Sequence, residues 1–162
     1  MIKNLPVAVL DSSNLGARNS LAWADTLAGL ATCGSGLGLS HGIALGVGSL
    51  LGDIPYGLAL ASVYRACLEF TWSSAVPVCA RLGQLFDPAL EKVPDTEAAE
   101  RCPDLLQDFL DLIDLASPLR DFGIANEELI SLARQSMVLP HYKNNPKVPS
   151  PDEMVKLFKD SY

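Results

Sequence analysis

The sequence is poor in histidine and has no paired cysteines. Its 162 residues include two histidines, His41 and His141, and four cysteines, none of which forms a Cys-x-x-Cys pair. Structural zinc sites use four Cys or His ligands at short spacings, so the sequence argues against one. No apolar segment of the secretory type follows the first residues, which argues against export and a disulfide framework. We therefore predict a cytoplasmic protein whose cysteines are buried free thiols.

Basic residues are also scarce. Lys and Arg number 12 against 19 Asp and Glu, which gives a net charge of −7, and no basic run occurs. Proteins that bind nucleic acid concentrate Lys and Arg to contact phosphates, so this composition argues against nucleic acid as a partner. Charged residues make up 19% of the chain and hydrophobic residues 49%. A chain of this length can bury one sizeable core, and we predict a single domain over residues 1–162.

No segment shows the apolar–polar alternation of a strand, whereas helical periodicity covers nearly the whole chain. Proline, glycine and N-cap residues divide this pattern into separate segments. We predict an all-α bundle of about seven helices, near residues 15–33, 37–51, 55–71, 75–86, 96–116, 127–137 and 150–160. The segment 96–116 is acidic and amphipathic, and its core-facing side chains are predicted to be Leu105, Phe109, Leu112, Ile113 and Ala116.

Charged residues are missing from Thr26 to Gly52, a run of 27 residues that is long enough to cross a membrane. Eight glycines lie within this run, however, and the segment Gly34-Ser35-Gly36 divides it into two short pieces. No flanking Lys or Arg bias and no aromatic belt accompany it. We therefore predict no membrane span, and instead a buried helical hairpin that other helices cover on all sides.

Several blocks of the sequence follow the motifs of one family. The segments "GLGLSHGIALG" and "IPYGLALA" match G-H-x-x-x-H-P-L-G and P-H-G-x-x-x-A in order and spacing, with one extra residue between them. The segments "FGIANEELISLARQSM" and "NNPKVPSPDEMVKLFKDSY" match two later signatures. Over about residues 5–162, the chain thus resembles the C-terminal helical domain of the iron-containing (group III) alcohol dehydrogenases, a dehydroquinate synthase-like fold. The resemblance implies Fe or Zn and NAD(P) as the family's cofactors.

The family's metal ligands are carried over only in part. By resemblance, His41 is the first histidine of H-x-x-x-H, whereas Leu45 occupies the second position, which relays a proton in the family. Tyr56 occupies the position of the P-H-G histidine, another metal ligand. The family's Asp and His ligands and its NAD(P)-binding domain have no counterpart. Because a bound Zn²⁺ or Fe²⁺ needs at least three protein ligands, we predict that His41 and Tyr56 are remnants of a metal site and that this chain alone holds no cofactor.

The other candidate residues are predicted to be structural. Asp25 is expected on the polar side of its helix, and an Asp25–His41 pair is the alternative hypothesis. His141 is expected to be solvated in a proline-bounded loop. Glycines 34, 36 and 38 resemble a dinucleotide-binding loop, but no strand precedes them, so no cofactor-binding residue is predicted. A solvated acidic face is predicted from Asp104, Asp108, Asp111 and Asp114.

These observations favour a truncated and degenerate iron-containing alcohol dehydrogenase-like protein, with no catalytic residue of its own. Two alternatives are the helical half of a split NAD(P)- and metal-dependent alcohol dehydrogenase, completed by another chain, and a non-catalytic helical interaction module. Loss of a nucleotide-binding domain would uncover more apolar surface than monomers usually expose. We therefore expect a homo-oligomer, or a complex with a chain that carries the missing domain.

Overall fold

The computed structural model describes residues 1–52 and 54–162, and the all-α prediction is confirmed for them: they contain no strand. The α-helices in this part of the chain number eight rather than about seven. They are α1 (Leu5–Leu10), α2 (Leu15–Ser35), α3 (Leu39–Leu51), α4 (Tyr56–Thr71), α5 (Val76–Phe86), α6 (Asp95–Leu112), α7 (Leu129–Ser136) and α8 (Pro151–Asp160). Short 3₁₀ helices connect them: η1 (Trp72–Ser74), η2 (Pro88–Lys92), η3 (Leu119–Phe122), η4 (Asn126–Glu128) and η5 (Pro140–Asn144).

The main core is built around α3, which packs against α4, α7 and η5. Leu39, Ile43 and Val47 recur at the spacing of one helical face and are almost fully buried. They belong to a cluster that also includes the fully buried Phe158 of α8. The glycine-rich pattern of α3 therefore serves close helix packing in the body of the molecule.

A second, smaller core lies between α5 and α6, which pack against each other more extensively than any other two of these helices. It contains Cys79 and Cys102, while Cys67 is buried in the main core. Burial raises the pKa of the Cys67 and Cys102 thiols to about 12. The prediction of buried free thiols is confirmed for these three residues and wrong for Cys33, which is exposed on α2.

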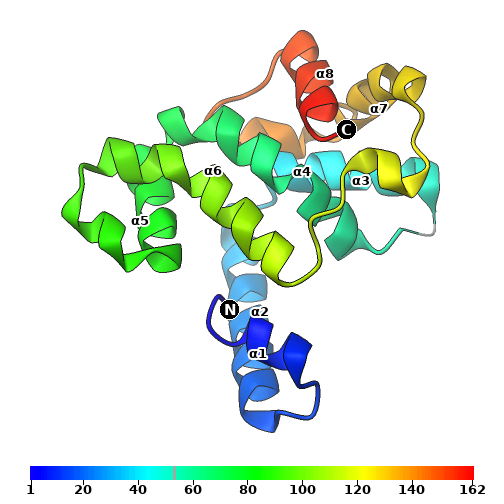
Figure 1. Ribbon diagram of the computed structural model, residues 1–162. Helices are drawn as coiled ribbons and strands as arrows, with labels where there is room; N and C mark the ends of the chain where they lie inside the picture. Colours follow the sequence, from blue (N-terminus) through cyan, green and yellow to red (C-terminus); the bar gives the residue numbers. More distant parts are fainter. Residues whose placement is uncertain (53) are drawn as a thin grey trace.

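Helix α2 is much more exposed than the predicted buried hairpin. It projects from the body of the molecule with α1 alongside its outer part (Figure 1). Ala17 is its only buried residue, and Trp23 is 64% exposed. The predicted hairpin with other helices on all sides is thus wrong for α2 and right for α3 only in part, because Ser49 and Leu50 near its end are exposed. The sequence pattern could not distinguish them, because the uncharged run from Thr26 to Gly52 includes the second half of α2 and all of α3.

Among residues 1–52 and 54–162, no single helix is long and apolar enough to span a bilayer. Helices α2 and α3 meet these criteria only as a pair, and the chain bends by 100° between them.

The bend between α2 and α3 is held by a segment more than a hundred residues away. Gly36 has a positive φ of 72°, which glycine adopts without strain. Asn144 of η5 donates a hydrogen bond from Nδ2 to the Leu37 carbonyl oxygen at 2.9 Å. Its neighbour Asn145 donates to the Thr71 hydroxyl at the end of α4, at 2.8 Å. The two asparagines thus connect η5 to both α3 and α4.

The acidic helix agrees with the prediction except at its end. Leu105 and Phe109 are partly buried and Ile113 is buried, but Leu112 is 69% exposed. The buried face of α6 runs through Ala99, Cys102, Pro103 and Leu110 instead, and Leu112 lies off this face. The acidic face itself is confirmed as solvated: all four aspartates are exposed.

Candidate functional site

The candidate site lies where the first turn of α3 meets the start of α4. The Nδ1 atom of His41 and the hydroxyl oxygen of Tyr56 are 2.6 Å apart and share a hydrogen bond. The two rings are tilted by 36°, with centroids separated by 5.9 Å. Pro55 has the extended ψ of 129° that precedes a helix, and Tyr56 begins α4 directly after it. This local geometry presents the Tyr56 side chain to His41.

Both partners favour their neutral forms. Burial lowers the pKa of the His41 imidazole below its ordinary value of 6.5, and the nearby His141 lowers it further. Burial raises the pKa of the Tyr56 phenol above 10.0. At neutral pH the pair is therefore an uncharged imidazole–phenol hydrogen bond. Which group donates depends on the tautomer of His41, because only a protonated Nδ1 can donate to the phenol oxygen.

His141 lies closer to this site than predicted. It is half-buried in η5, and a β-carbon added to Gly42 would lie 3.6 Å from the His141 Cβ. His141 therefore packs against α3 next to His41, and the prediction of a solvated loop residue is wrong. No local pattern predicts this contact, because it depends on the packing of η5 against α3.

Leu45 lies one turn after His41 on α3 and carries no polar group. It lines a cavity of about 200 Å³ together with residues that follow α7, among them Val138 and Leu139. Ser136 also lines this cavity, and its buried hydroxyl has no hydrogen-bond partner. That hydroxyl lies against Gly46, whose lack of a β-carbon makes room for it. No proton relay can pass through Leu45.

The side chains at the site do not match the needs of a divalent metal. His41 supplies one imidazole, Leu45 supplies no ligand, and the Tyr56 phenol resists ionisation. Among residues 1–52 and 54–162, no three His, Cys, Asp or Glu side chains come together in a way that could hold a metal ion. A site for Zn²⁺ or Fe²⁺ needs at least three such donors. The predicted role of His41 and Tyr56 as remnant ligands stays a prediction.

Asp25 does not join this site. It is exposed on α2, where it lines an open groove beside α1 together with Arg18 and Leu21. The hydrogen bond of His41 goes to Tyr56 instead. The hypothesis of an Asp25–His41 pair is therefore wrong, because α2 points away from the body. The glycines between α2 and α3 follow a helix, not the strand that precedes a dinucleotide-binding loop.

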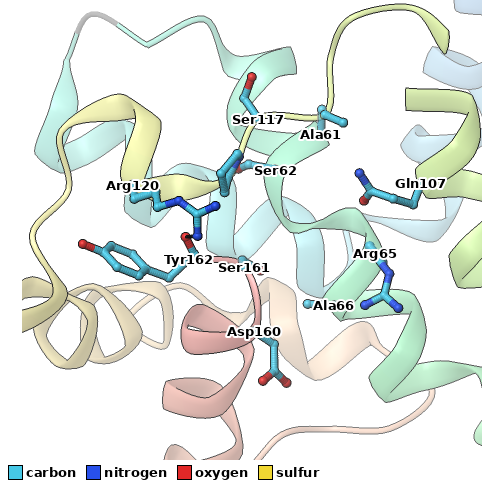
Figure 2. Close-up of a pocket in the computed structure, with 12 residues that line it drawn as sticks. Ala61, Ser62, Arg65, Ala66, Gln107, Ser117, Arg120, Asp160, Ser161 and Tyr162 are labelled. Atoms are coloured by element: carbon cyan, nitrogen blue, oxygen red, sulfur yellow. Dashed lines mark hydrogen bonds between the residues drawn. The ribbon is translucent and has the colours of Figure 1, made fainter. Parts of the chain in front are cut away.

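A different cavity lies beside the end of the chain. Figure 2 shows Arg120 and Tyr162 on one side of this cavity of about 210 Å³, with Arg65 and Gln107 on the other. The Arg120 guanidinium donates to the Tyr162 carbonyl oxygen at 2.8 Å, and Arg65 pairs with Asp104 at 2.7 Å. Both cations thus bind groups of this chain. The cavity contains none of the predicted site residues. The hydrogen bond from Arg120 to Tyr162 fastens the segment after α8 to η3.

Comparison with known proteins identifies the fold and the motifs together. The chain matches the Fe-containing alcohol dehydrogenase family, C-terminal, over residues 1–162. The chain belongs to this family. The resemblance predicted from the H-x-x-x-H and P-H-G blocks is thereby confirmed, as is the helical fold.

Individual relatives agree with this assignment. The long-chain primary alcohol dehydrogenase of Thermoanaerobacter ethanolicus is 26% identical over 166 residues, which cover 100% of this chain and 41% of that protein. The 1,3-propanediol dehydrogenase of Klebsiella pneumoniae is 26% identical, with 99% and 41% covered. A crystal structure of 1,3-propanediol oxidoreductase superposes with a TM-score of 0.94 at 25% identity, covering 99% of this chain and 42% of that one.

This member of the iron-containing alcohol dehydrogenase family therefore spans about two fifths of the length of the relatives it matches. The family name implies iron in its members. In this chain, two positions that carry histidines in the family motifs carry leucine and tyrosine.

Proposed function

We propose that this chain is a non-catalytic helical domain of the iron-containing alcohol dehydrogenase family. The observation that carries the proposal is the 2.6 Å hydrogen bond between His41 and Tyr56. It engages the only histidine left from the family's metal motifs with a side chain of this same polypeptide. This hydrogen bond thus links α3 to α4 without a metal ion.

Ligand chemistry supports this proposal. A metal bound between His41 and Tyr56 would have to displace their hydrogen bond and ionise a phenol whose pKa burial has raised. The leucine at position 45 provides neither a ligand nor a proton carrier. Metal-assisted hydride transfer from an alcohol needs the ion to polarise the alcohol oxygen, and this donor set is too small to hold it.

Metal analysis of the purified chain tests the proposal. Wild type and the His41→Ala variant are each incubated with Fe²⁺ or Zn²⁺, desalted, and measured by mass spectrometry for metal per chain. We expect far less than one equivalent in both proteins. One equivalent in wild type that is lost in His41→Ala and kept in a control variant, Asp25→Asn, would refute the proposal.

One observation favours a second candidate, the helical half of an enzyme that another chain completes. His41 is held neutral, and a metal-ligating histidine must be neutral. In that case the other chain would bring the nucleotide-binding domain and the remaining ligands. Protein that co-purifies with such a chain would then contain metal and oxidise primary alcohols with NAD(P), and His41→Ala would abolish both properties.

A cytoplasmic location fits either candidate. Cys67, Cys79 and Cys102 are buried as thiols, and none of the four cysteines is paired in a disulfide within the described residues. Unpaired thiols of this kind are typical of proteins in a reducing compartment.

A further inference from the structure

Two buried thiols occupy facing positions in the interface between α5 and α6. Cys79 belongs to α5 and Cys102 to α6, and both lie in the smaller core, with 3% and 0% of their surface exposed. Because other residues of this chain already bury both thiols, their surroundings do not depend on any further protein. His41 and Tyr56 belong to α3 and α4 instead, so the two thiols are separate from the candidate site.

Small residues around the two thiols let α5 and α6 approach each other closely. Ala80 and Gly83 of α5 are buried, as are Ala98 and Ala99 of α6. A β-carbon added to Gly83 would lie 2.7 Å from the Ala98 carbonyl oxygen, closer than real β-carbons come to another atom. The two backbones are therefore in direct contact at Gly83 and Ala98.

This contact also sets the register of the two helices. They form a hairpin around η2, in which Gly83 and Ala98 lie nearer the connection. Cys79 and Cys102 each lie four residues farther from it, which is about one helical turn, so they form the next facing pair. Burial raises the pKa of Cys102 to about 12, and the neighbouring Cys79 contributes to this increase. The two thiols are thus close enough to act on each other.

The register meets the distance requirement of a disulfide. Packed helices have axes about 8–10 Å apart, and each Cα atom lies about 2.3 Å from its axis, so directly facing Cα atoms are roughly 4–6 Å apart. Disulfides join Cα atoms separated by about 4.4–6.8 Å. A shared metal ion is the alternative use of two thiols. Within residues 1–52 and 54–162, however, no third His, Cys, Asp or Glu side chain joins them to complete a metal site.

We propose that Cys79 and Cys102 are a redox-active pair, which a small disulfide such as oxidised glutathione converts into an intramolecular disulfide between α5 and α6. The dithiol prevails where glutathione is reduced, and the disulfide accumulates as the ratio of oxidised to reduced glutathione rises. The proposal concerns residues away from His41, and it holds whether or not the chain binds metal.

The reaction proceeds by two thiol–disulfide exchanges. The Cys79 thiolate, which is the less buried of the two and follows the exposed Val78, attacks one sulfur of oxidised glutathione, breaks its S–S bond and releases one glutathione thiolate. The Cys102 thiolate then attacks the Cys79 sulfur of the mixed disulfide and releases the second glutathione. Two protein thiols are oxidised, one glutathione disulfide is reduced to two thiols, and the two protons pass to the released thiolates.

Burial affects the rate of this reaction more than its equilibrium. Little thiolate is present at neutral pH, since burial raises the pKa of both thiols, and a reagent reaches them only when the hairpin opens locally. We therefore expect slow oxidation, with the exposed Cys33 reacting first. The facing geometry should be evident in the equilibrium constant, because a fold that suits the disulfide favours it more than the unfolded chain does.

A glutathione titration tests the proposal on the 162-residue chain with Cys33→Ser and Cys67→Ala, which keeps only Cys79 and Cys102. The chain is equilibrated at graded ratios of oxidised to reduced glutathione, with and without denaturing urea, then quenched with acid and measured by mass spectrometry. We expect the equilibrium constant for the disulfide to be at least about tenfold larger in the folded chain, because a cross-link between positions that the fold brings together mainly constrains the unfolded chain. An equal or smaller constant in the folded chain would overturn the proposal.

A second pair of buried thiols provides the matched control. The chain with Cys33→Ser and Cys102→Ala keeps Cys67 and Cys79, which lie in different cores. We expect folding to lower the equilibrium constant for a disulfide in this variant, and an increase as large as that of the facing pair would contradict the proposed geometry.

Circular dichroism checks that both variants fold. If Cys67→Ala does not, Cys33→Ser alone gives the same test, because trypsin cleaves after Arg65, Arg81 and Arg101 and leaves the disulfide between peptides 66–81 and 102–120. Fragmentation of the linked peptides must then assign the bond to Cys79, and assignment to Cys67 would refute the proposal.

Discussion

At the scale of single residues, the main feature of the site is the Tyr56 hydroxyl, which lies next to the imidazole of His41. The Tyr56 phenol reaches His41 because α4 begins directly after Pro55 and packs along α3. A histidine at position 56 would offer a second imidazole to a metal. The phenol instead completes the hydrogen bonding of His41 on its Nδ1 side, and both groups remain uncharged at neutral pH.

The sequence identified His41 and Tyr56 because both fall inside recognisable motifs. It could not identify His141, because that residue reaches α3 only through a contact between distant segments. Asn144 and Leu37, whose hydrogen bond fixes this contact, are separated by 107 positions. A pattern that spans one or two helical turns carries no information on such a contact.

The neighbours of His41 can be tested by nuclear magnetic resonance titration. The pKa of His41 lies below 6.5, chiefly through burial and then through His141. We expect His141→Gln to raise the pKa of His41, because it removes the Coulombic effect of the neighbouring imidazole that lowers this pKa. Asp25→Asn should leave it unchanged, because α2 carries Asp25 away from the site. A shift in Asp25→Asn as large as that in His141→Gln would contradict the geometry.

At the scale of helices, periodicity predicted most boundaries within a few residues. The last helix is an example, since Ser150 accepts a hydrogen bond from the Glu153 backbone and forms the capping box that its sequence suggests. Helix α1 was missed because six residues give too short a pattern. The exposure of α2 was missed for a different reason. Periodicity shows which residues share a face, but it does not show whether a neighbour covers that face.

Two glycines of α3 offer a matched pair of variants. A β-carbon at Gly46 would overlap the Ser136 hydroxyl, whereas none of the atoms considered lies within 4 Å of a β-carbon at Gly48. We expect Gly46→Ala to lower the free energy of unfolding by about 1–3 kcal/mol, because α7 must move away from α3. Gly48→Ala should leave it unchanged or raise it by up to about 1 kcal/mol, since alanine favours helix. Urea denaturation measures both, and equal losses would show that the close approach of α7 is not what selects glycine at position 46.

At the scale of the whole molecule, the described residues form a body, α3 to α8, and an arm, α1 and α2 (Figure 1). The arm keeps the direction that it has in a solved relative, because the superposition covers 99% of this chain with a TM-score of 0.94. In that relative, this chain corresponds to only 42% of the polypeptide. The family fold is therefore consistent with an arm that depends on additional protein for cover, which no helical pattern within this chain reveals.

The arm should be less stable than the body when nothing binds it. In proteins most helical stability comes from packing one face against the rest of the fold, and α2 has a single buried residue to provide it. We expect backbone amides of residues 20–33 to exchange with deuterium at least about 100-fold faster than those of Ile43, Ala44 and Val47, because regions with few buried contacts open at low free energy. Equal protection in α2 and α3 would show that the arm unfolds only with the body.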